Sequence, residues 1–316
     1  MSLNYSRGDT ITRDTLLPLT RESWPRPAGG ATAARWHRLA ALGEVDLPLA
    51  KLVEPHHDAL AIVADLDGDP GRPDDIWAVW AAEPPFAVLQ AHESTGGWSL
   101  TGRKAFCSGA TLVSRALVTA STPDGARLFV VALPDYGITV DAQDHAWVGP
   151  GMARAATVTL SFDGVRAEPL GEAGDYTARP GFWWGAIGIA AIWWGGARGV
   201  ADVLEQAHER QDAHGRAHLG AVRADLEGLG LIVDAAARAG DSGDLTEHDV
   251  ERLALVVRQR SSEVVESVLS RVGRALGPGP LAFDADHARR VADLQVFVRQ
   301  HHAERDLERL GSMETR

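Results

Sequence analysis

Hydrophobic positions recur with a helical period in the first part of the chain. From Ala31 to Leu66 apolar residues follow each other at spacings of three and four, which predicts helices interrupted near Pro48 and Pro55. Residues 1–30 lack this period and contain three prolines and adjacent glycines, so we expect an extended arm there. The run 67–75 is rich in Asp, Gly and Pro and predicts a loop.

The period changes to two in the middle of the chain. From about Ile76 to Leu170 short apolar runs alternate with turn signals, such as the Pro-Asp-Gly sequence at residues 123–125. Residues 157–162 alternate between polar and apolar side chains, as a half-buried strand does. We therefore expect several short strands in a small antiparallel β-barrel or sandwich.

Helical periodicity returns after Pro180. The segment Phe182–Ala197 is strongly apolar but has only 16 residues, whereas a membrane span needs about 20. A buried helix is therefore expected, with an interfacial helix as the alternative. Further apolar stripes with short connections lie at 218–237, 247–276 and about 284–310, and predict an antiparallel four-helix bundle.

These patterns together predict an α+β chain in three parts. The N-terminal arm and helical domain is expected at residues 1–76, the β domain at 77–170 and the four-helix bundle at 171–316. A length of 316 residues is enough for two or three packed units with a sizeable core.

Charge and cysteine content exclude some classes of protein. The net charge is −12 and no block of like charges occurs, which argues against a protein that binds nucleic acid by neutralising phosphates. The single cysteine, Cys107, cannot form an internal disulfide, and a cytoplasmic location is expected. The N-terminal residues have no apolar core typical of a signal peptide. The histidine pairs lack a third ligand in reach, so no metal site is expected.

Three short motifs occur in a fixed order within the predicted β domain. They are Ala82-Glu83-Pro84, then Phe106-Cys107-Ser108-Gly109, and then Gly151 followed by Phe162-Asp163-Gly164-Val165. This order resembles the flavin-facing part of the acyl-CoA dehydrogenase family, of which the chain looks like a divergent, shortened member. The architecture of helices, β domain and four-helix bundle is also that of the family.

The resemblance implies bound FAD and assigns contacts to it. Phe106 and Ser108 would lie against the isoalloxazine ring, and the segment with Ala82 and Glu83 would pass over the flavin pyrimidine. A flavin needs hydrogen-bond donors near N5 and the pyrimidine carbonyls, because reduction builds negative charge there. The alternative is that Phe106 is a core residue and Ser108 a turn hydroxyl.

Other family segments are altered in this chain. The arginine by which one subunit reaches the FAD of its neighbour corresponds to Arg210, without the Phe-Gly that follows it in the family. The family's Gln-x-x-Gly-Gly pyrophosphate segment corresponds to Arg274 through Gly277 and Pro278. Arg274 would pair with phosphate, or it would satisfy carbonyls at the C-terminus of its helix.

The family's catalytic base is missing at its usual motif. Many members carry a glutamate in Tyr-Glu-Gly-Thr, a sequence that does not occur here. Counting from Gly277, that position falls near His301, with Glu304 one helical turn later. Either residue is a candidate base. The alternative is a surface helix in which His301 and Arg305, and likewise His302 and Asp306, are neighbours at i,i+4.

Tryptophans mark the expected substrate pocket. Trp183 and Trp194 are three turns apart on the helix that borders the acyl pocket in the family, and would shorten an acyl tunnel or stack on an aromatic or cyclic substrate. The alternative is core and subunit packing.

The resemblance favours an FAD-dependent oxidoreductase that α,β-desaturates a small or atypical acyl substrate. Two other functions stay open: oxidase or monooxygenase chemistry on the same fold, and a degenerate binding or scaffold protein without turnover. The expected partners are a small-molecule substrate, no nucleic acid, and further copies of the chain in a homodimer or homotetramer.

Overall fold

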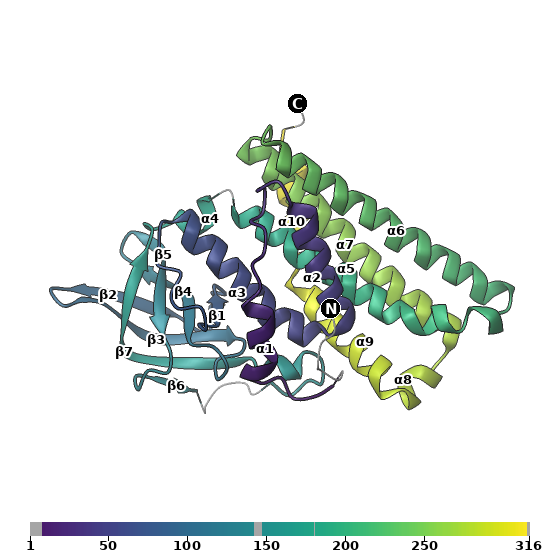
Figure 1. Cartoon of the computed structure of the whole chain (residues 1–316), viewed down its shortest axis with the longest axis horizontal. Coiled ribbons are helices and arrows are strands. Elements are labelled where there is room, and N and C mark those ends of the chain that lie inside the picture. The colour runs from purple at the N-terminus through teal and green to yellow at the C-terminus, as the bar shows by residue number, and fades with distance from the viewer. Residues whose placement is uncertain (1–7, 142–146, 180, 315–316) are drawn as a thin grey trace.

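The computed structural model describes residues 8–141, 147–179 and 181–314. The sheet and most of the helices lie at opposite ends of the molecule, with α3 between them (Figure 1). The helices are α1 (Arg13–Thr20), α2 (Thr32–Val45), α3 (Leu47–Asp65), α4 (Asp175–Ala178), α5 (Gly181–Gln206), α6 (Ala213–Ser242), α7 (Glu247–Leu276), α8 (Gly279–Phe283), α9 (Ala285–Phe297) and α10 (Glu304–Ser312), with 3-10 turns η1 (Ala153–Ala155), η2 (His208–Arg210) and η3 (Val298–Gln300).

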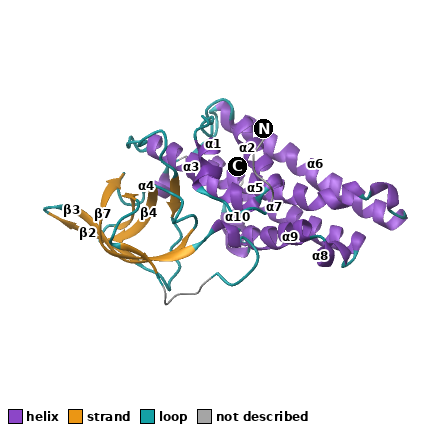
Figure 2. Cartoon of the chain, turned by 60° about the horizontal axis from the view of Figure 1, so that its bottom comes forward, coloured by secondary structure: helices purple, strands orange, loops and turns teal. Residues whose placement is uncertain are grey.

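Seven strands form the sheet at one end (Figure 2). They are β1 (Trp77–Trp80), β2 (Leu89–Ser94), β3 (Gly97–Cys107), β4 (Arg115–Thr122), β5 (Gly125–Ala132), β6 (Ile138–Val140) and β7 (Val158–Leu170). Pairing runs β4–β2–β3–β7–β5 and back to β4, which closes a small barrel. β1 adds to the edge of β4, and β6 adds to β7.

One feature of the barrel differs from the antiparallel prediction. β1 and β2 both run parallel to β4, whereas the other pairs are antiparallel. The reason is that residues 81–88 leave the sheet after β1 and return to the same edge of β4 further along, without reversing the chain. This excursion carries the predicted Ala82-Glu83-Pro84 segment out of the barrel and toward the helices.

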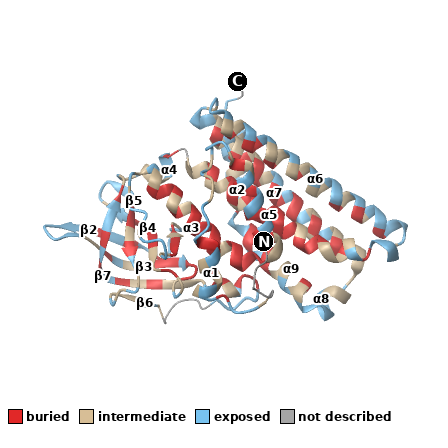
Figure 3. Cartoon of the chain, viewed as in Figure 1, coloured by how far each residue is buried: buried red, intermediate tan, exposed pale blue. Residues whose placement is uncertain are grey.

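The long helices α5, α6 and α7 confirm the predicted helical segments, and α5 is the most buried of them (Figure 3). α5 packs against α2, α6, α7 and α9. It approaches α2 closely because Gly195 has no side chain: a Cβ there would lie 1.9 Å from the carbonyl oxygen of Ala40. Among the described residues no helix has the length and apolar character needed to cross a membrane.

Two expectations for the N-terminal region were wrong. Part of the expected arm is helix α1, because Thr12 and Thr15 form a reciprocal capping box and the helix buries two leucines. The helical region breaks at Asp46, near Pro48 as expected, but it continues through Pro55, where a second interruption was expected. Pro48 lies in the first turn of α3, where its missing N–H has no cost, and Pro55 is accommodated inside the helix.

The last predicted helix, 284–310, is broken. α9 ends at Phe297, a 3-10 turn follows, and α10 starts only at Glu304. Ala303 takes a left-handed φ of 46°, which a continuous helix does not allow. The break takes His301 out of helical geometry and buries it, so the alternative that His301 lies beside Arg305 on a helix surface was wrong. The other pair of that alternative does form, because Nδ1 of His302 lies 3.4 Å from a carboxylate oxygen of Asp306.

Candidate active site

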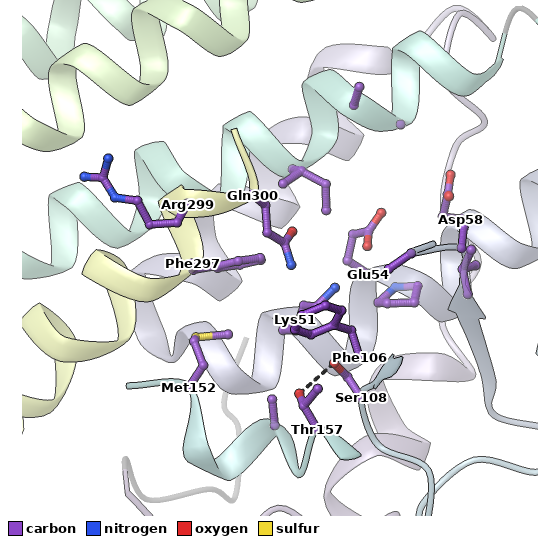
Figure 4. Close-up of a pocket in the computed structure, with 18 of the residues that line it drawn as sticks. Lys51, Glu54, Asp58, Phe106, Ser108, Met152, Thr157, Phe297, Arg299 and Gln300 are labelled. Atoms are coloured by element: carbon purple, nitrogen blue, oxygen red, sulfur yellow. Dashed lines mark hydrogen bonds between the residues drawn. The ribbon is translucent and has the colours of Figure 1, made fainter. Parts of the chain in front are cut away.

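A cavity of about 610 Å³ opens between the barrel and the helices (Figure 4). Its wall is formed by one face of α3, the strand ends of the barrel, the segment 147–157 with η1, helix α4, the start of α5, and the segment from α9 through η3. Residues from these parts include Lys51, Glu54, Asp58, Ala82, Phe106, Ser108, Met152, Thr157, Ile189, Phe297, Gln300 and His302.

The predicted flavin-facing segment lines this cavity. Phe106 has a left-handed φ of 59°, which is rare for a bulky residue and is typically found at functional sites. Phe106 as a residue is 48% exposed, so the alternative that it is a core residue was wrong. Trp80 fixes the backbone that follows, because its indole N–H donates to the carbonyl of Ser108 at 3.1 Å.

Ser108 presents its hydroxyl beside a second hydroxyl. The Oγ atom of Ser108 lies 2.9 Å from Oγ1 of Thr157. Ser108 follows the end of β3 and Thr157 precedes the paired strand β7, and both residues line the cavity. The pair therefore places two rotatable donor–acceptor groups on one patch of the wall.

Ala82 also lines the cavity, whereas Glu83 is not among the lining residues. Among the residues that the structure describes, none accepts a hydrogen bond from the N–H of Ala82. The Glu83 carboxylate lies 3.9 Å from the ammonium of Lys104, which is buried and donates to the carbonyl and hydroxyl of Thr119. Glu83 thereby ties the excursion after β1 to the inside of the barrel.

The two candidate bases do not line the cavity. His301 is buried, with its Nε2 atom 3.7 Å from a carboxylate oxygen of Asp306 and its ring 6.3 Å from that of Trp193. Burial, followed by the nearby charge of Arg258, lowers its pKa. Glu304 is exposed at the start of α10. The neighbouring His302 reaches the cavity wall instead.

The charged residues of the cavity wall include a group that we did not predict. Lys51, Glu54 and Asp58 are spaced by three and four residues, so they share one face of α3 (Figure 4). The pattern was present in the sequence, because these are the charged residues between Leu47 and Ala61 of an otherwise apolar helix. A charged residue within an apolar stripe is rarely buried unless it is paired or takes part in a functional site.

Burial shifts the pKa values of this group. Burial and then the charge of Asp58 raise the pKa of Glu54 to about 8, although Lys51 and Arg35 act in the opposite direction. Burial also raises the pKa of Asp58 and lowers that of Lys51. Shifts of this kind are concentrated at functional sites.

Several candidate residues lie away from the cavity. Arg210 and Arg274 are exposed, and Gly277 ends α7 with a φ of 67°. The end of α7 joins α8, on the side of the bundle opposite the sheet (Figure 1). Trp183 lines a separate surface hollow against α7 and α10, and the indole N–H of Trp194 donates to Leu226 on α6.

Comparison with solved structures gives close matches in fold. The dibenzothiophene monooxygenase TdsC from Paenibacillus sp. A11-2, seen with FMN and indole, matches with a TM-score of 0.77 and 20% identity over 95% of this chain and 88% of that one. Butyryl-CoA dehydrogenase from Megasphaera elsdenii matches with a TM-score of 0.78 and 17% identity over 95% and 88%. The chain has the acyl-CoA dehydrogenase fold.

A third solved structure with a similar fold is seen with FMN and a different small molecule. KijD3, seen with FMN and a dTDP-linked amino keto sugar, matches with a TM-score of 0.77 and 19% identity over 96% of this chain and 86% of that one. No protein-family model and no curated protein matches the chain in sequence. The similarity to these three solved structures confirms the predicted fold and architecture.

Proposed function

We propose that the chain is a flavin-dependent oxidoreductase that oxidises a small molecule in the cavity between the barrel and α3. The observation that carries this proposal is the convergence of three residues on one cavity. Ala82, Phe106 and Ser108 were expected to face a flavin from the sequence, and all three line the same wall.

The groups present on this wall fit a flavin. The Ser108 hydroxyl and the N–H of Ala82, for which the described residues offer no acceptor, are donors for the atoms on which reduction builds negative charge. The ring of Phe106 would cover one part of the isoalloxazine and exclude water from it. When bound, the flavin supplies the ability to accept two electrons from the substrate.

The resemblance predicts α,β-desaturation of a small or atypical acyl substrate, and we keep dehydrogenation as the first candidate reaction. Flavin oxygen chemistry, as an oxidase or monooxygenase, is the second. What favours the second is the cavity wall formed by α9 and η3, where Phe297, Arg299 and Gln300 lie and neither His301 nor Glu304 reaches. The match to the monooxygenase TdsC supports it as well.

The choice between FAD and FMN depends on a second copy of the chain. We propose FAD held by a homodimer or homotetramer, in which Arg210, Arg274 and Gly277 of one subunit contact the pyrophosphate bound to its neighbour. In one copy these residues lie at the end of the bundle that is away from the cavity. FMN, which TdsC and KijD3 contain, has no pyrophosphate and would need none of these contacts.

The first experiment is the visible absorption spectrum of the protein after separate incubation with FAD and FMN and removal of free flavin. Retained flavin bands in the wild type and in Trp183→Ala, with loss in Phe106→Ala/Ser108→Ala, would support the site. Retained flavin would then be tested for anaerobic reduction by butyryl-CoA, and for reoxidation by oxygen after dithionite. A folded wild type that retains neither flavin contradicts the proposed function.

A further inference from the structure

Removing two electrons from a substrate as hydride leaves one proton that needs an acceptor. The family places that acceptor after the last bundle helix, where this chain has His301 and Glu304, both away from the cavity wall. Within the part of the chain that the structure describes, the carboxyl groups on the wall are those of Glu54 and Asp58. Both belong to α3, in the N-terminal part of the chain, whereas the family's base lies in the C-terminal part.

We propose that Glu54 is the residue that accepts the substrate proton, so that the catalytic base of this site has moved from the C-terminal segment to α3. This inference rests on the proposed function, because it takes bound flavin as the acceptor of the hydride.

The geometry favours Glu54 over its neighbours. Glu54 as a residue is 6% exposed, yet it lines the cavity, and its side chain has no ion pair within 4.0 Å and no hydrogen bond to any residue that the structure describes. Its carboxylate oxygens are not fully buried, in contrast to Oδ1 of Asp58, so they are open to the cavity and can reach a molecule bound there. Phe106 and Ser108 lie on the facing part of the wall, where the flavin is proposed (Figure 4).

Asp58 is placed to tune Glu54 rather than to react. It lies one turn further along α3, and Gly185 leaves the space that it fills: a Cβ at Gly185 would lie 3.0 Å from Oδ1 of Asp58. That Oδ1 atom is buried and has no hydrogen-bond partner among the described residues. The charge of Asp58 acts on Glu54 from the side that is closed by α5.

The proposed step balances as follows. With an oxidised flavin bound, a C–H bond of the substrate would break, and the hydrogen would leave with the bonding electron pair as a hydride that the flavin would accept. A proton leaves a neighbouring substrate atom, whose bonding electrons form the new double bond, and the proton bonds to a carboxylate oxygen of Glu54. Glu54 then returns the proton to water before the next turnover.

Charged groups on several elements set the pH at which Glu54 ionises. Lys51 and Asp58 flank it on α3, and Arg35 of α2 acts on both acids. Asp58 also feels Arg179 and Asp65, which pair with each other at 3.0 Å, and it acts on Tyr176. With its pKa at about 8, Glu54 exchanges its proton close to neutral pH, where a general base is effective.

The test measures proton exchange without a known substrate. The flavin-loaded protein is equilibrated with redox dyes, and the midpoint potential of the bound flavin is recorded from pH 6 to pH 10. Reduction adds negative charge beside Glu54 and raises its pKa, so reduction takes up an additional proton where Glu54 is ionised. The plot of potential against pH is therefore expected to bend near pH 8 in the wild type and to lose this bend in Glu54→Gln.

Two further variants keep Glu54 and test the same point if Glu54→Gln does not fold. Asp58→Asn removes a negative charge and is expected to move the bend to lower pH, whereas Lys51→Met removes a positive charge and is expected to move it higher. A bend that stays in Glu54→Gln, or that neither neighbour moves, overturns the role of Glu54 while the flavin site stands. A protein that retains no flavin overturns both this role and the proposed function.

Discussion

The contact between α2 and α5 allows the cost of a single methyl group to be predicted. Gly195→Ala would place a Cβ 1.9 Å from the carbonyl oxygen of Ala40 and 2.6 Å from its carbon, where ordinary contact begins at 3.4 Å. The obstacle is backbone, so no side-chain rotation relieves it. The two helices must separate by more than 1 Å, or α5 must bend.

The expected loss is the difference of two effects. Overpacking a dense core costs about 1–3 kcal/mol, and a clash between two backbones lies at the upper end of this range. Alanine is a better helix former than glycine by about 1 kcal/mol, which offsets part of that cost. We therefore expect Gly195→Ala to lower the free energy of unfolding by about 2 kcal/mol, and the midpoint of thermal unfolding to fall by several degrees.

A matched control lies on α6. A Cβ at Gly220 would meet nothing within 4 Å, so Gly220→Ala gains the helix preference without a clash and is expected to stabilise by about 0.5–1 kcal/mol. Thermal unfolding followed by circular dichroism compares the two variants with the wild type. If Gly195→Ala is as stable as Gly220→Ala, the close approach of α2 and α5 is wrong.

Three other outcomes are expected. Burial is the largest cause of the raised pKa of Asp293, which shifts from 3.8 to about 6. The folded state therefore binds this proton more tightly than the unfolded state, so the free energy of unfolding falls as pH rises from about 4 to about 6; urea unfolding of Asp293→Asn should show a flatter profile there. Arg274→Ala should weaken FAD binding roughly 10- to 100-fold, as loss of a charge-assisted phosphate contact does, and leave FMN binding unchanged; equal losses by titration would contradict a pyrophosphate role. Burial raises the pKa of the Cys107 thiol, so it should react with a thiol reagent only after unfolding, and prompt reaction of the native protein would contradict its burial.

The elements that were predicted well have long, uniform patterns. α5, α6 and α7 each carry an apolar stripe over many turns, so local preference and tertiary packing agree. The break between α9 and α10 has no such signal, because residues 300–306 contain neither Gly nor Pro. It is set by tertiary contacts, in which His301 turns inward against Trp193 and toward Asp306.

The candidate site divides in the same way. Phe106 and Ser108 could be placed from the sequence only through the order of the three motifs, which resembles that of the acyl-CoA dehydrogenase family; the two residues alone would equally fit a core phenylalanine and a turn hydroxyl. The face with Lys51, Glu54 and Asp58 was missed because the apolar residues of the helix were counted and its charged residues were not. That Glu304 would not reach the cavity depends on the helix break, which local sequence does not contain.

Helix α3 has a consequence for how the chain can vary. It contacts the barrel through β1, the N-terminal helix α2, and the bundle through α5 and α9, and 14 of its 19 residues are buried. The same helix carries Lys51, Glu54 and Asp58 on the cavity wall. Few positions on α3 can therefore be substituted to change the reaction, because most substitutions there would destabilise the packing between sheet and bundle. New substrate preferences should arise first on the opposite wall, in the segment from Val296 to His302.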